Sequence, residues 1–160
     1  MVNEDLFIKM ALDAWHTYIR RTDELFSLFS DEQLMKEIAP GKNRGIYLLG
    51  HLAAVHDRML LVLGLGDPLY PALWQPFVES PDKEVTALPA TQTLRTYWKE
   101  INTNLNAKIS GLSAEEWFQK HTSVSVEDFT KEPHRNKLNI IINRTNHLAN
   151  HFGQLLLLKP

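Results

Sequence analysis

The chain has 160 residues and a formal net charge of -2, with 44% apolar residues, 22% charged residues and no cysteine. This length suits one domain, and this composition is typical of a folded globular protein rather than a disordered one. The small net charge gives no broad attraction to nucleic acid or to an anionic membrane, and the absence of cysteine excludes disulfides, a protein thiolate nucleophile and sulfur ligands to a metal.

A long amphipathic helix is predicted to open the chain, with Asn3 as its N-cap. The stretch from Ser30 to Gln33 has the pattern of a capping box, which predicts a short helical turn, and Pro40-Gly41 predicts a loop. The apolar residues of the first helix recur every three or four positions, at Ile8, Leu12, Trp15, Ile19, Phe26 and Phe29.

A second helix is predicted from about Asn43 to Leu63, where an apolar stripe is followed by Gly64, Gly66 and Pro68. Residues 65–89 contain five prolines and no sustained period, so we expect a long connection there. Long connections in compact domains often act as lids or binding loops, and substrate specificity is expected to reside in this one.

A third helix is predicted to follow Pro89 and to end around Gly111, and a second capping box, from Ser113 to Glu116, predicts another short turn. Residues 121–132 are polar and are predicted to form a loop. Pro133 fits the first turn of a fourth helix that continues to the C-terminus. Four amphipathic helices without a convincing strand pattern predict an all-α four-helix bundle, as one domain over residues 1–160.

Two histidines near the C-terminus, His147 and His151, have the i,i+4 spacing that lets two imidazoles on one helix face bind one metal ion. The spacing alone is weak evidence, since chance gives such a pair in roughly a quarter of sequences with this histidine content. His51, which lies in an apolar part of the second helix, is the best third ligand, although a hydrogen-bonded core histidine would show the same pattern.

Two classes of metal site are excluded by the residues around the histidines. The zinc-protease motif needs glutamate directly after its first histidine, but Leu148 stands there, and no predicted helix carries the Glu-x-x-His pair of di-iron bundles. His56 lies about 140° around the helix from His51, so it does not share the same ion. Gln154 could orient a ligand, while Gly153 either allows another helix to approach or is merely tolerated.

The chain resembles the DinB/YfiT-like superfamily of metalloenzymes. The resemblance rests on Pro40-Gly41-Lys42-Asn43, on Leu49-Gly50-His51-Leu52-Ala53 and on His147-x-x-x-His151-Phe152-Gly153-Gln154-Leu155. It implies an up-down-down-up four-helix bundle, commonly a homodimer, with a divalent metal held by His51, His147 and His151. Zinc or nickel is expected first, and iron, cobalt or manganese also suit imidazole ligands.

The resemblance implies a metal-dependent enzyme, either a thiol-dependent S-transferase that uses an external low-molecular-weight thiol or a hydrolase, acting on a small molecule. Three neutral imidazoles leave the charge of the ion undiminished, which favours deprotonation of a thiol or water molecule. No general base can be identified, so the catalytic residues stay unknown. The alternative is a non-catalytic, stress-related binding module, homodimeric, with a structural or vestigial metal site.

The expected location is the cytoplasm, without a nucleic-acid or membrane partner. No segment approaches the roughly 20 apolar residues that a membrane helix needs. Residues 1–20 mix acidic and basic side chains, which is unlike a signal peptide.

Overall fold

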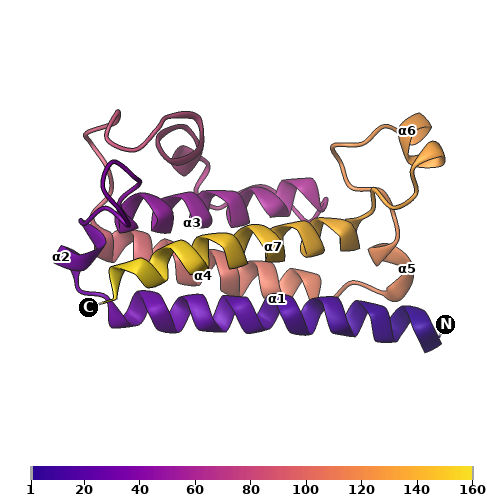
Figure 1. Ribbon diagram of the computed structural model, residues 1–160. Coiled ribbons are helices and arrows are strands. Elements are labelled where there is room, and N and C mark those ends of the chain that lie inside the picture. Colours follow the sequence, from indigo (N-terminus) through magenta and orange to yellow (C-terminus); the bar gives the residue numbers. More distant parts are fainter. Residues whose placement is uncertain (1, 160) are drawn as a thin grey trace.

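Four long helices dominate the computed structural model, which describes residues 2–159 (Figure 1). They are α1 (Val2–Leu28), α3 (Gly45–Val62), α4 (Thr91–Ile109) and α7 (Lys137–Leu155). The described residues form no strand, only isolated β-bridges, which confirms the all-α prediction. None of the helices in this part of the chain is both long enough and apolar enough to cross a membrane.

The bundle has the up-down-down-up order that the resemblance implies. Helices α1 and α7 run in one direction, and α3 and α4 run in the other (Figure 1). Each parallel pair is also a contacting pair, α1 with α7 and α3 with α4. Because α3 and α4 are parallel, the chain must return along the full length of a helix between them, which explains the long connection after α3.

Both predicted capping boxes are confirmed. The Ser30 hydroxyl accepts the amide of Gln33, whose side chain accepts the amide of Ser30, and these bonds start α2 (Asp31–Leu34). Ser113 and Glu116 do the same for α5 (Ala114–Trp117). Such reciprocal bonds satisfy amides that a helix start otherwise leaves without partners, so these short helices are encoded locally.

Residues 121–132 are not simply a loop, because they contain α6 (Val126–Lys131). The Ser125 hydroxyl accepts the amide of Asp128 at 3.0 Å and caps this helix. Val126 is exposed and α6 buries no residue, so there is no apolar periodicity to reveal it. The prediction failed because it depended on periodicity, although the serine cap was visible in the sequence.

Two predicted helix starts are wrong. Helix α1 already begins at Val2, so Asn3 lies inside it and is not its N-cap. Helix α7 begins at Lys137, and its N-cap is Asn136, whose side chain accepts the amide of Asn139 at 2.9 Å. A bridge to Lys120 holds Asn136 in extended conformation, so the helix cannot start at Pro133.

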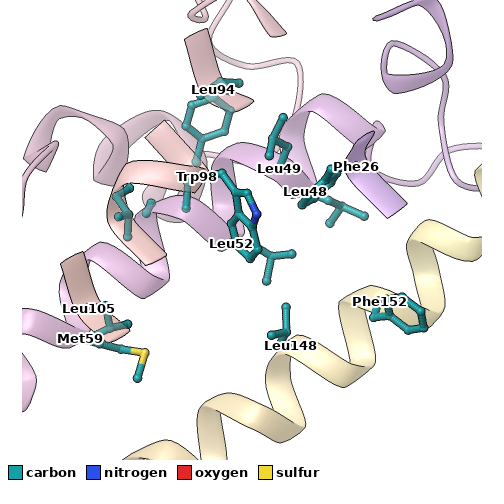
Figure 2. Close-up of a cluster of buried hydrophobic side chains, with 14 of the residues drawn as sticks. Phe26, Leu48, Leu49, Leu52, Met59, Leu94, Trp98, Leu105, Leu148 and Phe152 are labelled. Atoms are coloured by element: carbon teal, nitrogen blue, oxygen red, sulfur yellow. The ribbon is translucent and has the colours of Figure 1, made fainter. Parts of the chain in front are cut away.

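The core lies where the four long helices meet. Leu52 of α3, Trp98 of α4 and Leu148 of α7 point toward one another in its centre (Figure 2). Each fully buried apolar side chain of this kind contributes about 1.5–3 kcal/mol to folding. Of the stripe predicted for the first helix, Ile8, Trp15, Phe26 and Phe29 are buried there, whereas Leu12 and Ile19 are only half-buried.

The connection between α3 and α4 is anchored to α3 along its length. It contains two short helices, η1 (Pro71–Leu73) and η2 (Gln75–Glu79). The buried carboxylate of Asp57 accepts the amides of Leu69 and Tyr70 at 2.8 and 2.7 Å. Tyr47 donates its hydroxyl to the Ser80 carbonyl at 2.8 Å.

An ion pair between Arg44 and Asp82, at 2.7 Å, fastens the same connection to the start of α3. With these anchors the segment forms a fixed wall against α3.

Candidate metal centre

The structure brings together the three histidines selected from the sequence. His51 lies on α3, and His147 and His151 lie one turn apart on α7. The Nε2 atom of His147 is 3.2 Å from the Nε2 atoms of both His51 and His151. One ligand nitrogen from each ring lies within 4.8 Å of the others, and all three side chains are partly buried.

The outer nitrogens of two of these rings are held by hydrogen bonds. His51 donates from Nδ1 to the carbonyl oxygen of Phe77 at 2.8 Å, and His151 donates from Nδ1 to the side-chain oxygen of Gln154 at 2.8 Å. Both oxygens can only accept, so the ring proton resides on Nδ1. The Nε2 lone pairs are thereby directed into the cluster, the arrangement typical of metal-ligating histidines.

All three imidazoles are neutral at pH 7. Burial lowers the pKa of His51 and His151, and burial together with its two histidine neighbours lowers the pKa of His147 to about 4. A proton on Nε2 of His147 could be donated to the Nε2 lone pair of only one of its two neighbours, His51 or His151. A cation between the three nitrogens would satisfy all of them.

The nitrogen spacing fits a divalent metal. Tetrahedral bonds of about 2.0–2.1 Å from imidazole nitrogens place the ligand atoms about 3.3–3.4 Å apart. The two Nε2–Nε2 distances of 3.2 Å in the cluster are close to this value. Two of the three nitrogen pairs therefore already have the spacing of ligands to one ion, and the third pair lies within 4.8 Å.

The cluster has three members. No fourth histidine, aspartate or glutamate of residues 2–159 joins these three in one ligand group. A structural zinc site normally has four protein ligands, whereas a catalytic site has three and an open position. This ligand count corresponds to the catalytic kind.

His56 lies outside the cluster, in a buried pocket of aromatic rings. Its ring centroid is 4.9 Å from that of Trp15 and 5.1 Å from that of Trp98. Its Nδ1 donates to the side-chain oxygen of Asn102 at 2.9 Å, because the amide nitrogen of Asn102 is already donated to the Trp98 carbonyl. The Nε2 of His56 is left buried and without a partner among the described residues.

Two residues beside the cluster were not selected from the sequence. Phe77 contributes a main-chain carbonyl, for which a sequence carries no direct signal. Arg144 is partly buried and lies three residues before His147 and seven before His151, so the helical period could have placed it on the same face.

Removing the hydrogen bond to His151 is expected to weaken metal binding. Gln154→Ala should raise the metal dissociation constant about tenfold, because the His151 ring loses the acceptor that orients it. Asn150→Ala, an exposed change on the same helix, is the matched control and should leave the constant unchanged. Equal constants for the two variants in competition with a chromogenic chelator would contradict the role of Gln154.

Metal binding is expected to release few protons, because the lowered pKa values leave the three imidazoles largely deprotonated in the metal-free protein. Three histidines with an ordinary pKa near 6.5 would together release about 1.5 protons at pH 6.5. We therefore expect the histidines to release fewer than about 1.5 protons at pH 6.5, because each lowered pKa reduces the number of protons bound beforehand. Calorimetric titration in buffers of different ionisation enthalpy measures this number, and a release of about 1.5 protons or more would contradict the expectation.

Comparison with known proteins agrees with these features. The family model described as the DinB superfamily matches residues 14–155, a span that includes His51, His147 and His151. No curated protein sequence matches the chain. The match covers the four long helices apart from the first residues of α1.

Proposed function

The chain belongs to the DinB superfamily, and from this premise we propose that it is a divalent-metal-dependent enzyme acting on a small molecule. The reaction is either transfer of an external low-molecular-weight thiol or hydrolysis. The observation that carries this proposal is the convergence of three neutral imidazoles without a fourth protein ligand among the described residues.

His51, His147 and His151 would hold the ion. A divalent ion there would supply Lewis acidity that lowers the pKa of a thiol or water molecule toward neutrality. The three residues contribute no negative charge that would reduce this acidity. Zinc or nickel suits an imidazole ligand set, as do iron, cobalt and manganese.

A thiol must come from outside the protein. The chain contains no cysteine, so it has no thiol of its own to transfer. Two of the rings are held by Phe77 and Gln154 and keep their Nε2 atoms directed at the shared position. These bonds hold the ligands in place before the ion or the substrate arrives, which reduces the ordering cost on binding.

Elemental analysis of the untagged protein tests the metal part of the proposal. About one divalent ion per chain is expected in the wild type, and none in His147→Ala/His151→Ala, because a single imidazole remains. Circular dichroism checks that the variant is still helical. A folded wild type that contains no metal and takes up neither zinc nor nickel would overturn the proposal.

Turnover is tested with the reconstituted protein. We expect it to accelerate either the reaction of 2-mercaptoethanol with a chromogenic electrophile or the hydrolysis of an activated ester, and to lose this activity with a chelator. Metal binding without either activity, across a panel of both substrate types, would favour the non-catalytic binding module.

A further inference from the structure

Arg144 has no protein partner for its charge. Its guanidinium makes no hydrogen bond or ion pair with residues 2–159. None of its nitrogens is among the buried unpartnered atoms, so the partly buried side chain still reaches solvent. An uncompensated charge in such a position weakens folding, which makes its presence informative.

The other arginines of the described chain all have partners. Arg20, Arg44 and Arg135 pair with carboxylates, and Arg95 donates to main-chain carbonyls of α1 and its end. The remaining two, Arg21 and Arg58, lie over aromatic rings. Within residues 2–159, Arg144 is therefore the arginine left without a protein group to bind.

Arg144 lies beside the histidine cluster. It precedes His147 by three residues and His151 by seven, which places all three on one face of α7. Its charge also lowers the pKa of His51 and His147, so it is within electrostatic reach of both helices of the site. No carboxylate shifts the pKa of any of the three histidines, so the positive charge here is not offset by the protein.

We propose that Arg144 binds an anionic group, of the carboxylate type, on the molecule that occupies the open position beside His51, His147 and His151. This inference rests on the proposed function and specifies its substrate class as small anionic molecules. A guanidinium binds a carboxylate through two parallel hydrogen bonds, which orients the bound molecule as well as attracting it. Arg144 is thus a specificity-determining residue.

The test compares two thiols of similar size on cobalt-substituted protein. The probes are 3-mercaptopropionate, which has a carboxylate, and 2-mercaptoethanol, which is neutral, and the thiolate-to-cobalt absorption gives each dissociation constant. The preference for the carboxylate probe is measured in the wild type, in Arg144→Gln and in Arg20→Gln. Arg20 pairs with Glu24 on α1, so its variant makes the same change in net charge away from the site.

The wild type and Arg20→Gln should prefer 3-mercaptopropionate, and this preference should fall about tenfold in Arg144→Gln while cobalt content stays the same. Attraction of the carboxylate to the ion itself is common to all three proteins and cancels in this comparison. An unchanged preference in Arg144→Gln would overturn the inference and leave the proposed function standing. If neither thiol binds the cobalt-loaded protein, the inference is overturned together with the thiol-transfer reaction, and hydrolysis is the reaction of the proposed function that still stands.

Arg144→Lys covers the case in which the glutamine variant does not fold. Lysine keeps the charge and loses the two-pronged geometry, so the preference should fall about threefold. A preference equal to that of the wild type would count against recognition by the guanidinium.

Discussion

Gly50→Ala is expected to destabilise the protein by about 2 kcal/mol and to weaken metal binding at least tenfold. A Cβ atom at this position would lie 2.3–2.5 Å from three ring carbons of Phe77, far inside contact distance. Phe77 is fully buried and cannot yield without disturbing the core. Its carbonyl accepts the hydrogen bond of His51, so a shift of Phe77 also releases that ligand.

Gly153→Ala is the control for this substitution. Gly153 is exposed in α7, and apart from the neighbouring backbone of its own helix no described atom lies within 4 Å of an added Cβ, so no other helix of the described chain approaches it closely. Alanine here should stabilise the protein by about 0.5–1 kcal/mol, because a glycine inside a helix carries an entropic cost. Urea unfolding and metal titration measure the stability and the metal affinity of both variants. Equal changes in Gly50→Ala and Gly153→Ala would contradict the role assigned to Phe77.

The helices could be predicted because their signals are local. The apolar stripes of α1, α3, α4 and α7 follow from burial of one face, and the caps at Ser30 and Ser113 use residues three apart. The start of α7 is different, because Lys137 donates its amide to the Gln119 carbonyl. That tertiary bond outweighs the local preference of Pro133 for a first helical turn.

The site could be predicted in part for the same reason. His147 and His151 are neighbours on one helix, so their convergence is a local property, whereas the contribution of His51 depends on how α3 packs against α7. The carbonyl of Phe77 lies 26 residues from His51, in a segment without periodicity. Gly50, next to His51 in the sequence, was the one local signal of this contact, because a glycine often marks a position where another part of the chain packs closely against the backbone.

Acid is expected to unfold this protein through His56. The ring is fully buried, and this burial lowers its pKa from 6.5 to about 3. In the unfolded chain the same histidine binds a proton below pH 6.5, whereas in the folded protein it stays neutral down to about pH 3. Above pH 6.5 the titration of His56 therefore does not reduce the stability of the folded protein. As the pH decreases from 6.5 to about 3, the free energy of unfolding falls by about 1.4 kcal/mol per pH unit.

Across the whole interval this one group accounts for about 4–5 kcal/mol, a large fraction of the stability of an ordinary domain. His56→Gln removes the titration, and although it costs stability at pH 7 through the altered contact with Asn102, that cost does not depend on pH. The free energy of unfolding of both chelator-treated proteins is measured with urea from pH 7 to 4.5. It should depend less steeply on pH in the variant, by a slope that corresponds to about one bound proton. The histidines of the metal cluster titrate in both proteins, so their effect cancels when the two pH dependences are compared. If the free energy of unfolding has the same pH dependence in both proteins, His56 binds its proton in the folded state as readily as in the unfolded chain, which would contradict its lowered pKa.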